Sequence, residues 1–380
     1  MRIGFTGGGT GGHFYPLIAV AEVLNKNYKD TEKYLYYFGN GDGADFEALK
    51  RNEINFVKIS AGKNRLYFSF ENFKDMFKTF WGIIQGMFKL AIYYPDVIFS
   101  KGGYVAFPVL FVSRILRIPI IIHDSDTVPG RVTLYSAKFA KKILIAWPEC
   151  GEYLLNTKMI NPDKINFIGL PIRQKLLPQT NVLSISGAFT NLKNNMPTLY
   201  IVGGSQGSQK LNEAILASLP IILPYAQIIH QTGKTNFDSV KLISQKLIEN
   251  VEQKDNYFPI AYLDEDMQRE VFQKTSLVIC RGGSQILEFF TWGLPSVMIP
   301  LPKDISRDQT TNSFAAMQRG AAYVIEEKNL TPRILQNEVL RLLKDHKILA
   351  NMSASARQYA KIDAAEKVAE ILINTGKSHK

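Results

Sequence analysis

Cysteine and long apolar runs are both scarce in this sequence. Only two cysteines, Cys150 and Cys280, occur among 380 residues, far apart and each within an apolar stretch. This spacing gives no disulfide framework or metal cluster and favours a reducing cytoplasm. No apolar run reaches the roughly 20 residues that a membrane-spanning helix needs, and the N-terminus lacks the apolar core and cleavage site of a signal peptide. We therefore expect a protein that is soluble or attached to a membrane surface.

Two familiar catalytic patterns are missing as well. The complete Walker sequence G-x-x-x-x-G-K-[ST] does not occur, which argues against a P-loop ATPase, and there is no H-E-x-x-H zinc motif. We expect no metal and no other cofactor.

Acidic residues are outnumbered by basic ones. The 45 Lys and Arg residues exceed the 34 Asp and Glu residues, so the formal charge is +11. Such an excess suits an anionic partner, which could be nucleic acid, an acidic membrane surface or a phosphorylated substrate. The hydrophobic fraction of 46% is that of a folded globular protein. Because 380 residues are too many for one ordinary core, we expect two domains.

Short apolar strands alternate with helical stretches along both halves of the chain, which predicts βαβ units and parallel sheets. Helices are expected near 16–25 and 108–116 in the first half and from about Ser208 in the second. The expected strands are Arg2–Phe5, Tyr34–Phe38, Phe56–Ile59, Val97–Phe99, Ile118–His123, Ile143–Ala146, Thr198–Val202, Ala226–His230, Pro259–Ala261, Leu277–Cys280 and Ser296–Ile299.

The segment between the two series, 169–197, is rich in Pro, Asn and Ser and is typical of a hinge followed by a loose connection. The fold class is therefore α/β, with two Rossmann-like domains whose parallel sheets face each other across a cleft. Ligands of such sheets bind at the carboxyl ends of the strands.

Glycine-rich loops follow three of the expected strands. The loop at 7–12 satisfies G-x-G-x-x-G, a second loop lies at 101–104, and a third at 203–208 opens the second half. Bare N–H groups at a helix start form an anion site, and the third loop suits a pyrophosphate. NAD or FAD is disfavoured, because Gly39 and Asn40 stand where a ribose-binding acid is needed. A tight turn without a ligand would explain one or two glycines in the first loop but not five.

Four polar residues at three places in the chain are candidates for chemistry. His13 lies near a helix start, where the dipole favours a neutral imidazole that can accept a proton from an attacking hydroxyl; a simple helix cap is the alternative. Glu288, inside an apolar run, suits two ribose hydroxyls, or is a first-turn Glu favoured by the helix dipole. Asp308 and Gln309 follow a strand and suit sugar hydroxyls, although loops are often rich in such residues.

A cluster of one histidine and two carboxylates, His123, Asp124 and Asp126, ends the strand at 118–122. It could be a metal site, but no further ligand spacing supports that. We prefer acceptor binding.

Residues 70–94 form an aromatic, amphipathic helical stretch with Lys63, Arg65, Lys74, Lys78 and Lys89 around it. One face must pack on the sheet, yet apolar groups surround much of the helix. Bulky aromatics beside lysines suit an anionic bilayer surface, which we favour over a core helix. The expected membrane contacts are Phe73, Phe77, Phe80, Trp81 and Ile84.

These motifs occur in the order found in one enzyme family. They are Gly8–His13, Lys101–Val105, His123–Asp126, Gly169–Arg173, Gly203–Gly207 and Arg281–Glu288. On these residues the chain, from 1 to about 325, resembles the UDP-N-acetylglucosamine–N-acetylmuramyl-(pentapeptide) pyrophosphoryl-undecaprenol N-acetylglucosaminyltransferases.

The resemblance implies a type B glycosyltransferase fold, with the lipid acceptor on the first domain and the UDP-sugar on the second. It also implies a uracil pocket near Leu263. The domains expected are 1–168 and 169–352, with 353–380 holding a last helix that crosses back to the first domain. The implied donor-binding residues are Thr10, Gly11, Gly12, Arg173, Ser205, Gln206, Gly207, Leu263, Arg281, Glu288, Asp308 and Gln309. The expected acceptor-binding residues are Gly102, Gly103, Tyr104, His123, Asp124 and Asp126.

The implied reaction is inverting transfer of N-acetylglucosamine from UDP-N-acetylglucosamine to the 4-hydroxyl of the muramyl sugar of undecaprenyl-pyrophosphate-linked muramyl pentapeptide, with His13 as the base. We expect the protein to act at the cytoplasmic face of the cell membrane, where it would bind an anionic surface. We expect no nucleic-acid partner. The alternatives are a diacylglycerol glycosyltransferase of the same fold, a UDP-sugar epimerase, and a non-catalytic UDP-sugar-binding subunit.

Overall fold

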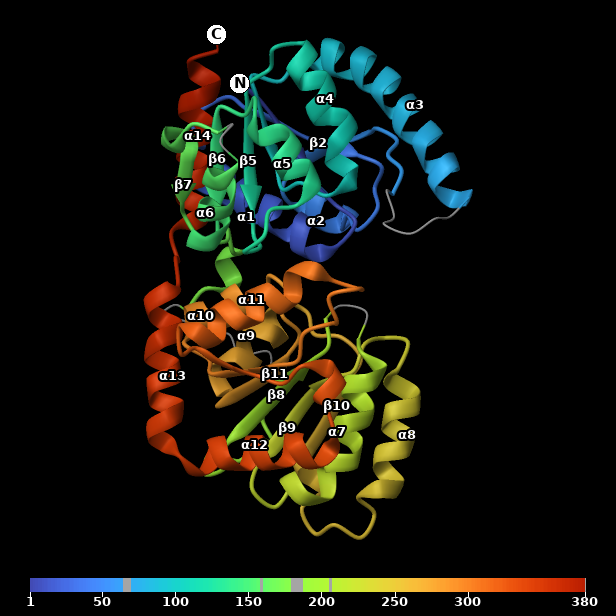
Figure 1. The fold of residues 1–380 in the computed structure, drawn as a ribbon, viewed down its shortest axis with the longest axis vertical. Helices are drawn as coiled ribbons and strands as arrows, with labels where there is room; N and C mark the ends of the chain where they lie inside the picture. The colour runs from blue at the N-terminus through green and yellow to red at the C-terminus, as the bar shows by residue number, and fades with distance from the viewer. Residues whose placement is uncertain (64–69, 158–159, 179–186, 205–206, 380) are drawn as a thin grey trace. The chain divides into compact units, whose positions relative to one another are not determined.

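The chain folds into two compact units, which Figure 1 shows in a computed structural model. The structure describes residues 1–63, 70–157, 160–178, 187–204 and 207–379. One unit comprises Met1–Gln174 and Lys361–Lys380, and the other comprises Lys175–Ala360. The chain therefore leaves the first unit after Gln174, rather than after 168, and returns at Lys361, rather than at 353.

The first unit is built on a seven-stranded parallel sheet with the order β3-β2-β1-β4-β5-β6-β7. Its strands are β1 (Arg2–Thr6), β2 (Tyr34–Gly39), β3 (Ile54–Lys58), β4 (Val97–Ser100), β5 (Ile120–Asp124), β6 (Lys142–Ile145) and β7 (Ile165–Phe167). The central strands β4 and β5 are buried along their whole length, as their unbroken apolar sequences predict for a sheet covered on both faces.

The second unit repeats this order. Its six-stranded parallel sheet runs β10-β9-β8-β11-β12-β13. The strands are β8 (Thr198–Val202), β9 (Gln227–Gln231), β10 (Tyr257–Ile260), β11 (Leu277–Cys280), β12 (Ser296–Met298) and β13 (Ala322–Val324). The α/β class with two Rossmann-like domains is thus confirmed, and the two sheets share one strand order, with one strand fewer in the second.

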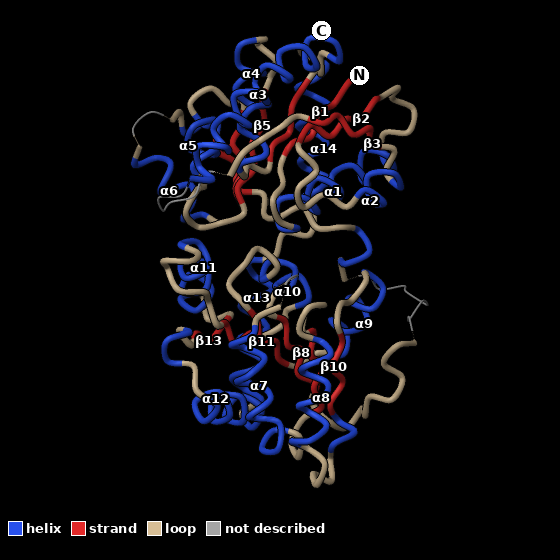
Figure 2. The backbone as a smooth tube through the Cα atoms, turned by 90° about the vertical axis from the view of Figure 1, so that its right-hand side faces the viewer, coloured by secondary structure: helices blue, strands red, loops and turns tan. Residues whose placement is uncertain are grey.

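Helices cover both faces of each sheet, as Figure 2 shows. Those of the first unit are α1 (Gly11–Asn27), α2 (Phe46–Arg51), α3 (Phe70–Tyr93), α4 (Phe107–Ile115), α5 (Arg131–Ala137), α6 (Pro148–Asn156) and α14 (Ala364–Lys377). Those of the second unit are α7 (Gln209–Ile222), α8 (Phe237–Leu247), α9 (Glu265–Lys274), α10 (Ile286–Trp292), α11 (Arg307–Gln318), α12 (Pro332–Lys344) and α13 (His346–Tyr359).

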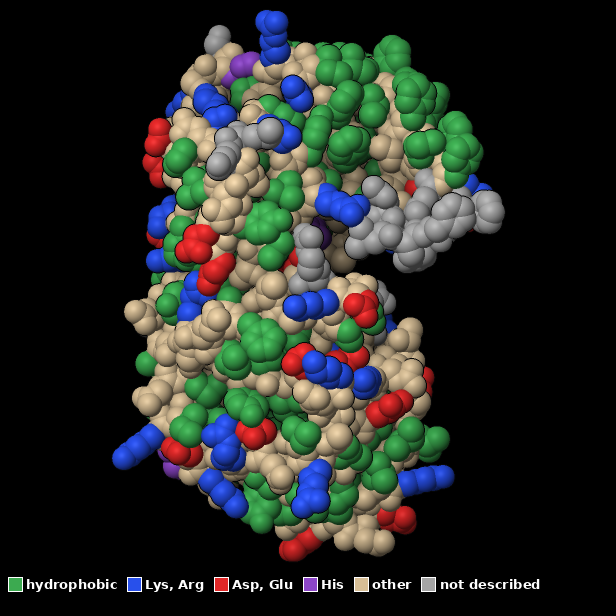
Figure 3. Space-filling model, viewed as in Figure 1, with side chains coloured by type: hydrophobic (Ala, Val, Ile, Leu, Met, Phe, Trp, Pro, Cys, Tyr) green, Lys and Arg blue, Asp and Glu red, His purple; other side chains and the backbone are tan. Residues whose placement is uncertain are grey.

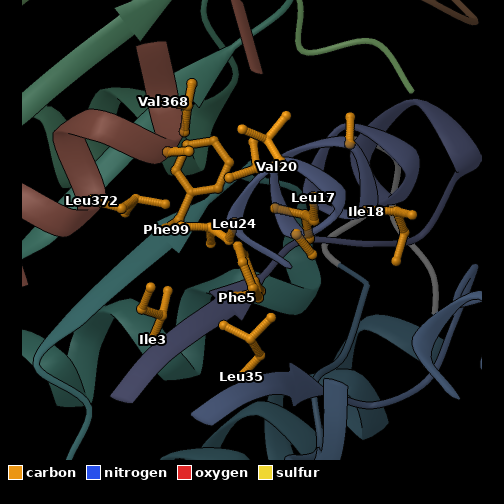
Figure 4. Packing of buried hydrophobic residues seen from close by; sticks show 14 of the residues in the cluster. Ile3, Phe5, Leu17, Ile18, Val20, Leu24, Leu35, Phe99, Val368 and Leu372 are labelled. Atoms are coloured by element: carbon orange, nitrogen blue, oxygen red, sulfur yellow. The ribbon is translucent and has the colours of Figure 1, made fainter. Parts of the chain in front are cut away.

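Helix α14 completes the core of the first unit, although it lies at the other end of the sequence. Val368 and Leu372 are fully buried and belong to the same apolar cluster as Ile3, Phe5 and Phe99 (Figure 4). The last helix, α14, lies in the first unit, whereas α13 stays with the second unit and ends at Tyr359.

Every expected strand is present, with ends displaced by three residues or fewer. Two further strands, β7 and β13, were not expected. Each is three residues long and pairs on one side only. Neither therefore carries the long apolar run of a central strand.

A buried histidine ties three elements of the second unit together. His230 on β9 is fully buried, with Nδ1 2.8 Å from the hydroxyl of Tyr257 and Nε2 3.1 Å from Oδ1 of Asn212. Since the amide oxygen of Asn212 can only accept, Nε2 carries the proton and Nδ1 accepts from Tyr257. Burial lowers the pKa of His230 to about 3.

We expect this histidine to make the protein less stable in acid. Folding lowers the pKa of His230, so its contribution to the free energy of unfolding is present above pH 6.5. That contribution is lost as the pH falls toward the pKa of the folded state. Between pH 7 and pH 5 the free energy of unfolding should fall by about 2 kcal/mol more in the wild type than in His230→Gln. Urea unfolding at both pH values measures this, and an equal pH dependence in the two proteins would contradict it.

Candidate functional site

The first candidate site lies at the carboxyl edge of the first sheet. The strand order reverses between β1 and β4, so the loops that follow these strands flank the switch point, where ligands of such sheets bind. The first glycine loop follows β1 and leads into α1, and the second follows β4. The second sheet has the same switch point between β8 and β11.

Glycines, which have no side chain, let three loops of the first unit approach one another. The N–H of Gly9 donates to the carbonyl of Asp42 over 2.9 Å. A Cβ on Gly103 would lie 2.7 Å from the carbonyl oxygen of Gly8, so only glycine allows this contact. Tyr104 closes the cluster by donating its hydroxyl to Asp42 over 2.6 Å. The glycines thus bring both loops and Tyr104 to one edge of the sheet.

His13 is oriented by the residue that begins its helix. Thr10 has extended backbone angles at the N-cap of α1, and its hydroxyl lies 3.0 Å from Nδ1 of His13. If Nδ1–H donates to Thr10, Nε2 carries the free lone pair that a general base needs. The first N–H groups of the helix, at Gly11 and Gly12, have no intrahelical acceptor and can meet an anion.

The surroundings of His13 disfavour its protonated form. Its side chain is half-buried. Desolvation and then the positive charge of Lys101 lower its pKa to about 4, with Asp124 acting in the opposite direction. The imidazole is therefore neutral at physiological pH, and the causes are burial and Lys101.

His123 is fully buried behind the second glycine loop. Its Nδ1 lies 2.6 Å from the ammonium of Lys101 and its Nε2 lies 2.7 Å from the carbonyl oxygen of Gly169. Both ring nitrogens are therefore engaged inside the unit. Of the predicted acceptor contacts next to it, Asp124 accepts from the N–H groups of Asp126 and Gly130, both over 3.0 Å.

Arg173 also lies within the first unit. Its guanidinium stacks 4.1 Å from the ring centre of Tyr15, and the side chain is buried. Such stacking fixes the plane of the guanidinium.

In the second unit, glycines again allow close packing at the sheet edge. A Cβ on Gly207 would lie 2.1 Å from the carbonyl oxygen of Thr232. A Cβ on Gly282 would lie 2.3 Å from the carbonyl oxygen of Gln309, and Asn312 donates to the carbonyl of Gly282 over 3.1 Å. The structure thus brings the loop after β11 next to the start of α11, which carries Asp308 and Gln309.

Arg281 is bound on several sides within the second unit. It pairs with Glu327 over 2.5 Å, donates to the carbonyl of Ile299 over 2.9 Å, and donates to the hydroxyl of Ser208, which is the N-cap of α7. The side chain is buried. It therefore braces the start of the helix that follows the third glycine loop.

The remaining predicted donor residues are placed as follows. Glu288 lies half-buried in the first turn of α10. Burial raises the pKa of Tyr200, and the negative charge of Glu288 raises it further. Leu263 is fully buried, which leaves only its backbone for a base contact. Ser205 and Gln206 lie outside the described residues. Within the described residues no cluster of three or more His, Cys, Asp or Glu side chains could hold a metal ion.

Several aromatic side chains of helix α3 are exposed. Phe73, Phe77, Phe80 and Trp81 are exposed by 62%, 58%, 62% and 55%, and Ile84 is half-buried. The apolar atoms gather along the outer edge of α3 in Figure 3.

The inward face of α3 carries two glycines between the buried side chains of Asp75 and Leu90. Gly82 and Gly86 are buried, and a Cβ on Gly82 would lie 1.8 Å from the carbonyl oxygen of Ser60. Gln85 accepts from the N–H of Ser60 over 2.8 Å. The helix thus packs through its glycines and leaves its aromatic residues exposed, the reverse of an ordinary surface helix.

The two halves of the chain match the two domain models of one enzyme family. Residues 3–145 match the glycosyltransferase family 28 N-terminal domain, and residues 198–370 match the C-terminal domain of the same family. The chain belongs to glycosyltransferase family 28.

Named relatives of this glycosyltransferase share much of its sequence. A UDP-N-acetylglucosamine–N-acetylmuramyl-(pentapeptide) pyrophosphoryl-undecaprenol N-acetylglucosamine transferase of Treponema denticola is 34% identical, over 93% of this chain and 90% of that protein. One of the same name from Staphylococcus aureus is 35% identical, over 98% of this chain and 99% of that protein.

Solved structures agree on the fold. The crystal structure of MurG from Acinetobacter baumannii has a TM-score of 0.71 at 23% identity, over 98% of this chain and 99% of that one. A UDP-GlcNAc 2-epimerase from Neisseria meningitidis, bound to UDP-GlcNAc, has a TM-score of 0.69 at 15% identity, over 98% of this chain and 100% of that one. At these identities the likeness is one of fold alone.

Two features of the glycosyltransferase site were missed from the sequence. The contact of Thr10 with His13 was not foreseen, although the two residues stand three apart at a helix start, a spacing that brings side chains together. Lys101 was not counted among the site residues. A lysine inside an otherwise neutral glycine loop was the available signal.

We expect Thr10 and His13 to act as one unit in sugar transfer. His13→Ala should lower turnover by about 10² to 10⁴-fold if the imidazole is the general base. Thr10→Val keeps the shape but removes the hydroxyl, so it should lower turnover by about tenfold, because the required tautomer is no longer selected. In the His13→Ala background, Thr10→Val should cost nothing further. Additive losses in steady-state turnover would separate the two residues.

Proposed function

We propose that this glycosyltransferase transfers N-acetylglucosamine from UDP-N-acetylglucosamine to undecaprenyl-pyrophosphoryl-N-acetylmuramyl pentapeptide. The product is the complete lipid-linked disaccharide precursor of peptidoglycan. The observation that carries the proposal is identity of 34% and 35%, over nearly the whole chain, to enzymes named for this transfer. The fold supports it without deciding it, since an epimerase shares the fold.

In the proposed step, the 4-hydroxyl oxygen of the muramyl sugar attacks the anomeric carbon of the donor. The bond from that carbon to the diphosphate oxygen breaks as the new bond forms, which inverts the configuration, and UDP leaves with its charge. Nε2 of His13 takes the hydroxyl proton, with Nδ1–H directed to Thr10.

The positive helix starts carry the electrostatic part of the mechanism. The N–H groups that open α7, held by Ser208 and Arg281, would stabilise the charge on the leaving diphosphate. Glu288 would bind the donor ribose and Gln309 the sugar. No metal or other cofactor enters the proposed reaction.

The direct test is a transfer assay with radiolabelled UDP-N-acetylglucosamine. We expect label in a lipid-extractable product only when the lipid-linked muramyl acceptor is present. Transfer to diacylglycerol in its place would identify the rival lipid glycosyltransferase. Epimerised UDP-sugar formed without any lipid would identify an epimerase, and UDP-sugar binding without turnover would indicate a non-catalytic subunit.

The proposal includes attachment to the cytoplasmic face of the cell membrane through α3. In the described part of the chain no helix is long and apolar enough to cross a bilayer. Phe77, Phe80 and Trp81 of α3 are more than half exposed. The side chains of Lys74 and Lys78 beside them, which pair with carboxylates one turn earlier on the helix, are exposed by 70% and 59%. Apolar area together with cations is the combination that binds an anionic interface.

Replacing Phe80 and Trp81 together by Ser should lower binding to vesicles that contain phosphatidylglycerol. Transfer to a short-tailed soluble acceptor and the melting temperature should stay near the wild-type values, because both side chains are largely exposed. Sedimentation with vesicles measures binding, which should also weaken with salt.

The matched control is Leu242→Ser with Ile243→Ser on α8, which removes similarly exposed apolar groups from the second unit. This control should bind vesicles as the wild type does. If the α3 variant loses stability and soluble-acceptor activity, Phe80 and Trp81 belong to the core, and the proposed membrane attachment through α3 is refuted.

A further inference from the structure

A buried lysine lies beneath the first glycine loop. Lys101 is only 2% exposed, and its backbone N–H donates to the carbonyl of Thr6 over 2.9 Å. A buried ammonium group is costly unless it is paired and hydrogen-bonded. Here Nζ lies 2.6 Å from Nδ1 of His123, whose other nitrogen is bound to the carbonyl of Gly169. Because a carbonyl only accepts, Nε2 of His123 carries the proton and Nδ1 accepts from the ammonium.

The groups around Lys101 keep its amine protonated at neutral pH, with a pKa only slightly above that pH. Burial lowers its pKa to about 8, against the carboxylates of Asp124 and Asp126, which raise it. At neutral pH the ammonium is therefore mostly protonated, and it is held away from water.

Lys101 and His13 are neighbours across a single glycine. A Cβ on Gly7 would lie 2.9 Å from Cβ of Lys101 and 3.1 Å from the carbonyl oxygen of His13. Two charged groups act on the imidazole of His13, with Lys101 disfavouring its protonation and Asp124 favouring it. The backbone around Gly7 therefore brings Lys101 close to the helix turn that carries His13, and the positive charge of Lys101 disfavours protonation of the imidazole.

The positive charge of Lys101 affects the protonation of His13 mainly when substrates are bound. A histidine of ordinary pKa is already about 90% neutral at pH 7.5, so the empty enzyme gains little from the cation. The proposed substrates, however, each bring a diphosphate. Negative charge close to an imidazole raises its pKa by about 1 to 3 units, which would protonate an uncompensated base at neutral pH.

We propose that Lys101 is a positioning residue for His13, whose buried positive charge keeps the imidazole unprotonated while diphosphate substrates occupy the enzyme. The proposal rests on the function proposed above. His123 takes part by holding the ammonium in place and by accepting its proton in a hydrogen bond.

The first test uses the ligand-free full chain with ¹⁵N-labelled histidine, and the His13 signal is identified from its loss in His13→Gln. Between pH 8 and pH 5 the imidazole of the wild type should remain neutral. In Lys101→Met its titration midpoint should rise by about 1 unit, so that protonation becomes visible near pH 5. A His13 signal that stays unprotonated at pH 5 in Lys101→Met overturns the proposal.

The matched variant is Asp124→Asn, which removes the opposite charge from the same cluster. Its His13 should stay neutral over the whole pH range, because the remaining cation disfavours the proton. Loosened packing would instead raise the midpoint in both variants, which would overturn the proposal in favour of a structural role.

The second test is the pH dependence of turnover with both substrates saturating. The acid limb of Lys101→Met should lie about 1 unit above that of the wild type. Turnover at pH 6 should then fall by about tenfold and recover toward pH 8.5. Lys101→Arg keeps the charge and should keep the wild-type profile.

An equal loss at every pH would assign Lys101 a structural role and sink the proposal. Absence of transfer by the wild type would instead refute the proposed function, while the titration of His13 in the empty protein would still report on Lys101.

Discussion

The close approach of backbone to backbone at the carboxyl edges of the sheets is the constraint on which the rest of this molecule depends. At Gly8 and Gly103 the loops of the first unit meet at distances that a single methyl group would prevent. Gly207 and Gly282 do the same in the second unit. Because the glycines of these loops carry no side chains, the helix starts behind them are accessible to anions. Polar groups from separate strands also come together there.

The sequence predicted the order and position of the strands well, but it did not predict which segments pack against each other. Strands β8 and β11 have the expected bounds, because a central parallel strand is an apolar run with clear ends. Edge strands such as β7 carry no such signal, since half of their surroundings are solvent or loop. The segment 353–380 was expected to hold one helix, but it holds the end of α13 and the whole of α14. The chain breaks at Ala360 because the two helices pack in different units, which the sequence alone does not show.

The candidate site shows the same division. The order of motifs along the chain is enough to find the glycine loops and His13. It does not show that Thr10 faces the imidazole ring or that both nitrogens of His123 are bound inside the unit, because ring orientation is set by tertiary contacts. It also left open whether the aromatic residues of α3 are core or surface. The glycines at 82 and 86 decide this, since they form the face that packs closely and leave the large side chains outside.

The position of α14 has a consequence for biosynthesis. Val368 and Leu372 belong to the core around Ile3 and Phe5, so the first unit to leave the ribosome lacks part of its interior until the late residues emerge. The second unit is one continuous segment, 175–360, and has all of its own residues before then. Although domains generally fold in the order of synthesis, here the unit made first is the one completed last. Its unfinished apolar surface needs protection during translation, and truncated chains that end before α14 should be targets for chaperones and proteases.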